Sequence, residues 1–262
     1  MIGVLGSGSW ATCIVKILLE KEGRSVNWLV RDQEIADGVC RCGKNPRYLC
    51  NTYLDPNRLN ISTDIREVVE ASDELYLVVP SAFIAQQLSE LPKELIASKV
   101  WISAVKGMVS QSDYVVSDYL HFELGVPFDN IAVASGPTHA EELSCAQNSV
   151  ISVASCNMEL AKRVSKDMRC SYLYTYCTDA MRSVEYAGVL KNVYAVASGI
   201  LFGIDSCSML DERNVQFHRQ SSGSKTTIPR PQTAYSRLDG YLLVGTQPQP
   251  PTRHADWRRL YG

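Results

Sequence analysis

The sequence lacks a surplus of charge of either sign, and it lacks any long apolar run. Its 262 residues include 26 Lys/Arg and 28 Asp/Glu, which gives a formal net charge of −2. Nucleic acids and anionic membranes attract proteins through a concentrated basic face, so we expect neither as a partner. No stretch approaches the ~18 consecutive apolar residues of a membrane span, so we expect no membrane insertion. A small molecule is the expected ligand.

The sequence also lacks the features of a signal peptide and of a metal-binding cluster. The segment "MIGVLGSGSW" (residues 1–10) runs directly into a strand-like stretch, which leaves no room for the charged and apolar regions of a signal peptide. Nine cysteines, an odd and scattered set, suit free thiols in a reducing compartment. Cys40, Cys42 and Cys50 form a weak cluster without a nearby histidine. We therefore expect a cytoplasmic protein without a metal site.

What the sequence does contain is an alternation of short β-rich runs with helix-compatible segments. Residues 12–23 and 81–91 carry apolar residues at three- and four-residue spacing, which is typical of amphipathic helices. Such alternation predicts an α/β fold, a Rossmann-type doubly wound parallel sheet, over residues 1–180. The expected strands are residues 2–5, 26–30, 75–79, 100–103, 131–134 and 150–154.

Two changes of character follow this region. The stretch "AMRSVEYAGVLKNVYAVASGILFG" (residues 180–203) indicates one long apolar helix, so we expect residues 181–204 to be the first helix of a truncated helical substrate domain. Leu, Ile, Val and Phe then make up only 9 of the last 58 residues. That composition favours a disordered or frame-shifted tail over residues 205–262.

A glycine-rich turn follows the first expected strand. "VLGSGSWA" (residues 4–11) places Gly6, Gly8 and Ala11 in the G-x-G-x-x-A spacing between a strand and a helix. Gly6 permits the tight turn, Gly8 allows backbone amides to approach a pyrophosphate, and Ala11 allows the helix to pack close to the strand. The pattern predicts a dinucleotide cofactor, with a glycine turn that binds nothing as the alternative.

The second expected strand ends in "LVRD", where the choice between NAD and NADP is usually made. Asp32 could accept hydrogen bonds from the adenosine ribose of NAD, whereas Arg31 could hold the 2′-phosphate of NADP or stack on the adenine. Either residue could instead be a solvated charge at a strand end. The sequence leaves NAD and NADP open.

Two further strand ends carry candidate binding residues. Lys106 lies just past a strand, at the sheet edge where open α/β sheets bind ligands, although it could be a surface lysine. In "ASGPTHAEEL" (residues 134–143), Gly136 allows close backbone approach and Thr138 offers a hydroxyl. Thr138 could also be a simple helix N-cap. We expect His139 to be exposed rather than catalytic.

Lys191 lies in the middle of the apolar helix and is the candidate acid/base. The residues three, four and seven positions away on the same face are mostly small: Ala187, Gly188, Tyr194, Ala195 and Ser198. A buried amine without a partner would lose its proton, so a polar ligand is expected beside it. Asn192 could orient that amine or bind a hydroxyl. The alternative is a lysine that reaches the solvent from the helix edge.

Five motifs in register resemble the NAD(P)-dependent glycerol-3-phosphate dehydrogenase family over residues 1 to about 204. They are "GSGSWA", "VPS" (79–81), "VKG" (105–107), "GPTHAEE" (136–142) and "EYAGVLKNVYAVASGI" (185–200). The resemblance implies hydride transfer between NAD(P)H and dihydroxyacetone phosphate, which gives sn-glycerol 3-phosphate for glycerophospholipid synthesis. A homodimer is compatible with it.

Position by position, the resemblance also implies roles for individual residues. It makes Ser9, Trp10 and Arg31 cofactor contacts, and Lys106 a contact for both cofactor and substrate. It makes Gly136 and Thr138 substrate contacts, Ala140 a cofactor contact and Lys191 the catalytic acid/base.

The resemblance stops near residue 204. Family members continue through a helical domain that supplies an aspartate and a Ser/Gly-Arg-Asn segment, which clamps the substrate phosphate. The Arg213–Asn214 pair of this sequence lies too early and lacks the preceding context. We therefore expect impaired turnover. Two alternatives stay open: a non-catalytic NAD(P)-binding remnant, and a related dehydrogenase of another small acid or sugar phosphate.

Overall fold

The computed structural model describes residues 1–110 and 112–221, apart from the side chains of Asn192 and of residues 204–221. The chain divides into two units, Met1–Leu201 and Phe202–Gly262. The contacts described below lie within the first unit. In the second unit, the backbone of the last helix, α9, continues to Ser221, past the boundary expected at residue 204. The rest of the expected atypical tail, residues 222–262, lies outside the described residues.

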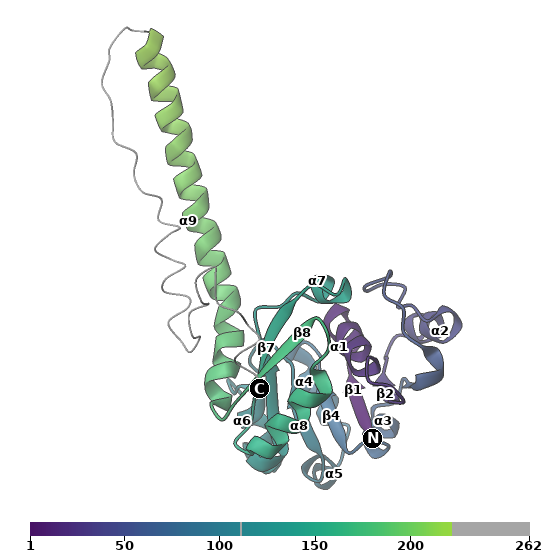
Figure 1. Cartoon of the computed structure of the whole chain (residues 1–262). Helices are drawn as coiled ribbons and strands as arrows, with labels where there is room; N and C mark the ends of the chain where they lie inside the picture. Colours follow the sequence, from purple (N-terminus) through teal and green to yellow (C-terminus); the bar gives the residue numbers. More distant parts are fainter. Residues whose placement is uncertain (111, 222–262) are drawn as a thin grey trace, which may run out of the picture. The chain divides into compact units, whose positions relative to one another are not determined.

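An eight-stranded sheet forms the centre of the first unit (Figure 1). Its strand order is β3-β2-β1-β4-β5-β6-β7-β8. All neighbouring strands are parallel except β6 and β7, which pair antiparallel. The strands are β1 (Ile2–Leu5), β2 (Val26–Leu29), β3 (Leu59–Ser62), β4 (Glu74–Leu77), β5 (Val100–Ser103), β6 (Ile131–Ser135), β7 (Ser149–Ala154) and β8 (Leu173–Thr178).

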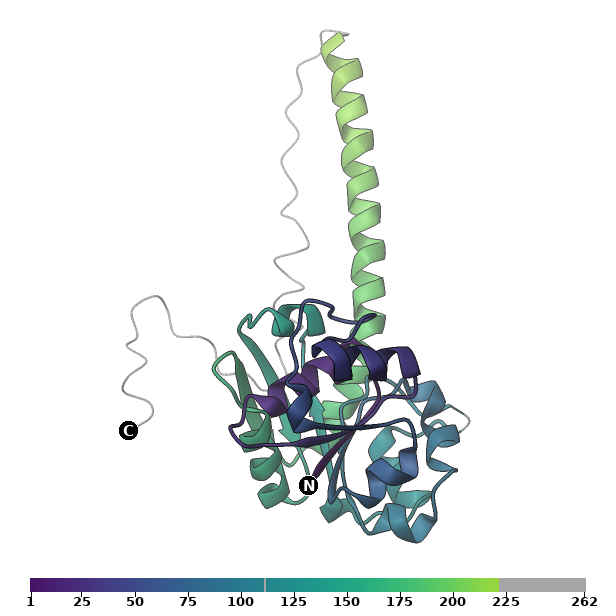
Figure 2. The ribbon, with the colours of Figure 1, turned by 90° about the vertical axis from the view of Figure 1, so that its right-hand side faces the viewer.

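Helices connect the strands and cover both faces of the sheet, as the two perpendicular views show (Figures 1 and 2). The α-helices are α1 (Ser9–Leu19), α2 (Gln33–Cys42), α3 (Ile65–Glu70), α4 (Ile84–Leu88), α5 (Lys93–Ala97), α6 (Val116–Phe122), α7 (Ala140–Ser144), α8 (Met158–Met168) and α9 (Met181–Ser221). Short 3₁₀ helices are η1 (Pro56–Arg58), η2 (Ser81–Phe83) and η3 (Phe128–Asn130). The doubly wound α/β fold expected from the sequence is confirmed.

The structure departs from the expected elements in three places. The six expected strands are present, but β3 and β8 form the two edges of the sheet and were not expected. The antiparallel β7 was expected to be parallel. Its connection from β6 contains the five-residue α7, and the two strands pair antiparallel with Val133 opposite Ala154. The single helix expected over residues 81–91 is divided into η2 and α4.

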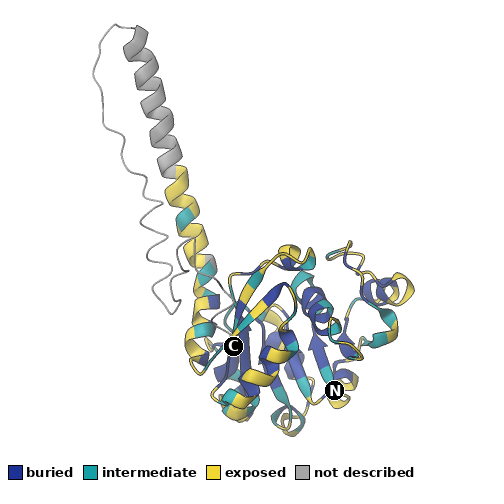
Figure 3. Ribbon diagram, in the orientation of Figure 1, coloured by how far each residue is buried: buried dark blue, intermediate teal, exposed yellow. Residues whose placement is uncertain are grey.

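The core has two halves, one on each face of the sheet. Adjacent residues of a strand point to opposite faces, so Val4 packs in one half and Leu5 in the other. The half around Val4 contains buried residues of α1, α2 and α8, and the half around Leu5 contains residues of α3, α4, α5 and α6. The strands are accordingly mostly buried (Figure 3). This packing fixes the carboxyl ends of the strands, from which the site is built.

The first turns of α9 are attached to the sheet domain by polar contacts. Glu185 is buried and accepts hydrogen bonds from the Ser117 hydroxyl and from the Ser117 backbone N–H (3.1 Å). Arg182 forms an ion pair with Asp118 at 2.9 Å. Gly188 lies so close to β6 that a Cβ atom there would be 2.8 Å from Ser135 Oγ. Within the described part of the chain, no helix combines the length and apolarity that a membrane crossing requires.

Candidate functional site

A cleft of about 660 Å³ opens at the carboxyl ends of the central strands. Its walls are the loops that follow β1, β4, β5 and β6, together with the end of β2. The strand order reverses direction between β1 and β4, and open α/β sheets bind ligands at such a switch point. The position of the cleft therefore follows from the topology of the sheet.

The glycine turn forms the floor of this cleft. Gly6 has a φ of 127°, and a Cβ atom there would lie 2.7 Å from the carbonyl oxygen of Val78. Gly8 is the N-cap of α1 and gives that helix no side-chain cap, so the first N–H groups of α1 remain available to an anion. The geometry explains why glycine is needed at Gly6: a side chain would collide with the loop after β4.

Three side chains hold the loops around the cleft in place. Trp28 donates its indole N–H to the Gly6 carbonyl at 2.6 Å, and Trp10 donates to the Ala104 carbonyl at 3.1 Å. Asn45, which is fully buried, donates to the Ser7 carbonyl at 3.0 Å. These bonds fix the glycine turn and the start of α1 against β2, the loop after β5 and the turn at residue 45.

Lys106 lies at the cleft, and the charge of Lys191 acts on it. Lys106 lies on the wall after β5, donates to the Thr138 carbonyl at 3.1 Å and has its Nζ 5.6 Å from the centre of the Trp10 ring. Burial lowers the pKa of Lys106, and the positive charge of Lys191 lowers that pKa further. Lys191 is half-buried rather than fully in solvent.

The loop after β6 brings Thr138 and Ala140 to the same cleft. Thr138 is not the N-cap of α7: that position belongs to His139, whose side chain is exposed as expected. The Thr138 hydroxyl is buried and has no hydrogen-bond partner among the described residues. At Gly136, a Cβ atom would lie 2.7 Å from the Val150 carbonyl oxygen, so this glycine is required by the close approach of β7.

The structure gathers most of the expected site residues at the cleft. Those that line it are Gly6, Gly8, Ser9, Trp10, Arg31, Lys106, Thr138 and Ala140. Asp32 lies beside the cleft but caps α2 and pairs with Arg47 at 2.5 Å. Gly136 and Lys191 do not line the cleft, and the side chain of Asn192 is outside the described residues.

Several cleft residues were not expected from the sequence. Gln87 lines the cleft while almost completely buried, and its Oε1 atom has no partner in the described chain. Its polar side chain on the apolar stripe of residues 84–91 was the available signal. Tyr48 lines the cleft from the turn "NPRY" (residues 45–48), and the Asn-Pro pair that marks this turn could have indicated it.

Comparisons with known proteins give the family of the chain. Residues 1–161 match the family described as "NAD-dependent glycerol-3-phosphate dehydrogenase N-terminus". The chain is 30% identical over 203 residues to glycerol-3-phosphate dehydrogenase [NAD(P)+] of Oceanobacillus iheyensis, covering 78% of this chain and 58% of that protein. It is 33% identical over 204 residues to the enzyme of the same name from Leptospira biflexa, covering 78% and 61%. The chain thus spans about 60% of the length of these relatives.

Solved structures give the same result. The crystal structure of glycerol-3-phosphate dehydrogenase from Coxiella burnetii superposes with a TM-score of 0.69 at 28% identity, covering 86% of this chain and 70% of that one. The enzyme from Plasmodium falciparum shares the fold, with a TM-score of 0.71 at 24% identity over 78% of this chain and 59% of that one. The chain belongs to the NAD-dependent glycerol-3-phosphate dehydrogenase family.

Proposed function

We propose that this chain binds NAD(P)(H) in the cleft and carries the lysine pair of a glycerol-3-phosphate dehydrogenase, which acts on dihydroxyacetone phosphate and glycerol 3-phosphate. The observation that carries the proposal is the cleft that brings Lys106 and Thr138 to the glycine turn. The positive charge of Lys191, from a distant segment, lowers the pKa of Lys106 there. Two positive charges placed together repel each other, and an anionic ligand between them offsets that cost. A phosphorylated substrate supplies such an anion.

The residues of the cleft fit a dinucleotide. Its volume of about 660 Å³ suits a cofactor site. Gly6 keeps a space that any side chain would fill, and the buried Gln87 and Thr138 side chains offer polar atoms that have no partner in the described chain. Gly6, Gly8, Ser9 and Trp10 would hold the pyrophosphate side, with Arg31 at the ribose and Ala140 and Lys106 toward the nicotinamide. Bound there, the nicotinamide supplies or accepts the hydride.

The protein's own residues would then handle the proton and the charge of the substrate. We assign Lys191 as the acid/base that gives a proton to the C2 oxygen during reduction and takes it back during oxidation. Lys106, held by the Thr138 carbonyl, would stabilise negative charge on the substrate oxygen. Gly136, Thr138 and Asn192 would complete the substrate side.

Assays on the full chain test this proposal directly. Titration of NADH and NADPH, followed by cofactor fluorescence, should show saturable binding. Loss of NADPH absorbance on addition of dihydroxyacetone phosphate should be small, because the sequence carries no family-like phosphate clamp after residue 204. Lys191→Met should remove that turnover by about 10²–10⁴-fold, as the loss of a general acid/base does, and leave cofactor binding in place. Lys166→Met on the exposed face of α8 is the matched control.

Each outcome separates the alternatives. Binding without any turnover identifies a non-catalytic dinucleotide-binding protein, whereas turnover only with another sugar phosphate or small acid identifies a related dehydrogenase. Absence of binding to either cofactor would overturn the proposal. We also propose a cytoplasmic location, which fractionation of the source cells would test, and a homodimer, which light scattering of the purified chain would test.

A further inference from the structure

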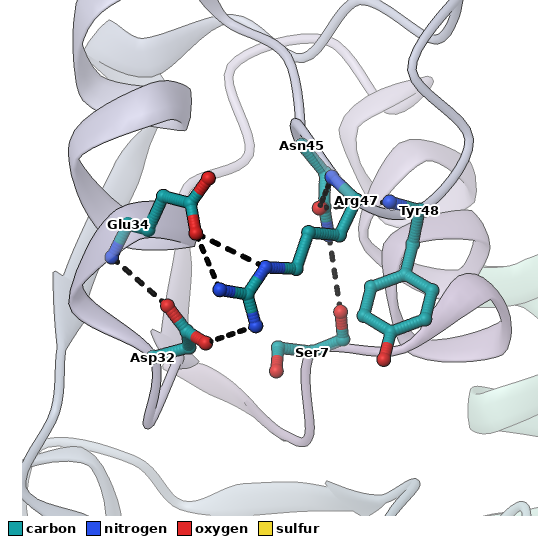
Figure 4. Close-up of polar contacts among 6 residues, drawn as sticks. All are labelled: Ser7, Asp32, Glu34, Asn45, Arg47 and Tyr48. Carbon is teal, nitrogen blue, oxygen red and sulfur yellow. Dashed lines mark hydrogen bonds and ion pairs between the residues drawn. The ribbon is translucent and has the colours of Figure 1, made fainter.

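Asp32, the acidic residue at the end of β2, has both of its carboxylate oxygens engaged within the protein (Figure 4). Its Oδ1 accepts from the Glu34 backbone N–H at 3.0 Å and thereby caps α2. Its Oδ2 accepts from Arg47 Nη1 at 2.5 Å. An acidic side chain at this corner selects NAD when it accepts hydrogen bonds from the ribose hydroxyls. Asp32 is therefore already committed to other partners.

Arg47 is held at this corner by the turn that precedes it. Asn45 donates to the Ser7 carbonyl at 3.0 Å and to Thr12 Oγ1 at 2.9 Å, which ties residue 45 to the glycine turn. Its Oδ1 accepts from the backbone N–H groups of Arg47 and Tyr48, both at 3.1 Å. The buried Asn45 thus sets the position of residues 45–48 relative to the cleft (Figure 4).

The guanidinium of Arg47 bridges two carboxylates. Besides its contact with Asp32, it donates from Nε to Glu34 Oε2 at 3.1 Å and pairs with the same oxygen through Nη2. One positive charge therefore faces two negative charges, and these three side chains together keep a formal charge of −1. Arg31, which lines the cleft one residue before Asp32, makes no ion pair among the described residues. With Arg31 included, the formal charge of these four side chains is zero rather than negative.

We propose that Arg47 is a specificity-determining residue that makes this chain prefer NADP(H) to NAD(H). The inference rests on the proposed function. By pairing with Asp32 and Glu34, Arg47 weakens the acidic selection for an unmodified ribose and reduces the repulsion that a 2′-phosphate would meet there. Arg31 is then the cation that faces the 2′-phosphate, a contact for which a guanidinium is well suited.

Isothermal titration of the full chain with NADP⁺ and NAD⁺ tests the proposal without relying on turnover. Wild type should bind NADP⁺ about tenfold more tightly than NAD⁺, the lower end of what a charge-assisted hydrogen bond contributes. Arg47→Gln should weaken NADP⁺ binding about tenfold or more and change NAD⁺ binding less than about threefold. Arg41→Gln, which removes an exposed arginine from the last turn of α2, should change neither affinity.

A second variant tests whether the loss of NADP⁺ affinity in Arg47→Gln comes from the charge of Asp32. Asp32→Asn in the Arg47→Gln background removes the exposed carboxylate and keeps a good helix cap, so NADP⁺ affinity should largely return. The pair of probes adenosine 2′,5′-bisphosphate and 5′-AMP should show the same ratios as NADP⁺ and NAD⁺, since they differ only in the 2′-phosphate.

Two results would overturn the inference: equal affinity of wild type for NADP⁺ and NAD⁺, or an equal change in both affinities on Arg47→Gln. A failure of wild type to bind either dinucleotide would instead overturn the proposed function. Thermal unfolding of each variant shows that the fold is kept. The Arg47 side chain is half-exposed, so its replacement should leave the core intact.

Discussion

The sheet domain and residues 193–201 of α9 contain similar apolar side chains in opposite environments. Ile14 on α1 is 0% exposed, whereas Ile200 on α9 is 58% exposed. Val193 and Val196 of α9 are exposed as well (Figure 3). The helices of the sheet domain pack one face against strands. The described polar contacts of α9 with the sheet domain lie only near the start of that helix. Apolar side chains form a core only where a second layer of helices or strands covers them.

The largest expected effect comes from truncating matched isoleucines in the two regions. Ile14→Ala removes a fully buried side chain and should lower the free energy of unfolding by about 2–5 kcal/mol. Ile200→Ala removes an exposed side chain of the same kind and should change it by less than about 0.5 kcal/mol. Urea denaturation measures both. Comparable losses at the two positions would mean that α9 is covered in solution, and the contrast would fail.

The next largest effect on stability is expected from replacing one glycine in each of the two regions. Gly6→Ala forces an L residue to a φ of 127° and places a Cβ atom against the Val78 carbonyl, which should cost about 1–3 kcal/mol in backbone strain alone and abolish dinucleotide binding. Gly199→Ala meets no described atom within 4 Å on α9 and should favour the helix by roughly 1 kcal/mol. Circular dichroism melts and cofactor titration report the two results. Retained binding in Gly6→Ala would contradict the assigned role of the turn.

A smaller, pH-dependent effect is expected where α9 joins the sheet domain. Burial raises the pKa of Glu185, and hydrogen bonds from Ser117 offset only part of that rise. The folded state therefore holds this proton more tightly than the unfolded state. The stability that Glu185 contributes is present below its ordinary pKa of 4.5 and is lost as the pH rises through the raised folded value.

Glu185→Gln removes this titration while keeping the shape of the side chain. The stability of the variant relative to wild type should increase as the pH rises from about 4 and then level off above the folded pKa of Glu185. Glu94→Gln, at an exposed position on α5, is the control and should show no such slope. A pH-independent difference between wild type and Glu185→Gln would show that Glu185 is not buried as described.

The sequence predicts the central strands well and the edges poorly. Central strands such as β1 and β4 are buried on both faces and read as continuous apolar runs, which is what the pattern detects. β3 is only partly buried, and β8 exposes Tyr174 and Tyr176, so neither produces such a run. The antiparallel pairing of β6 with β7 depends on the path of the connection between them, which periodicity does not report.

The residues of the candidate site likewise divide into those that the sequence predicts and those that it does not. Gly6, Lys106 and Thr138 could be predicted because each follows a strand at the sheet edge where ligands bind. Arg47 could not be, because its position depends on the hydrogen bonds of Asn45 to the glycine turn. The pairing of Arg47 with Asp32 is likewise a tertiary property, and residue identities at the end of β2 do not show it.

The central claim, that the positive charge of Lys191 acts on Lys106 at the wall of the cleft, is tested most directly by titrating the lysines. Reductive ¹³C-methylation of the full chain gives one NMR resonance for each lysine, and Lys106→Met identifies that of Lys106. We predict that this resonance titrates below the ordinary lysine pKa of 10.5 and that Lys191→Met raises its pKa, because a neighbouring positive charge is removed. An unchanged pKa of Lys106 in Lys191→Met would show that the charge of Lys191 does not reach Lys106 and would contradict the account.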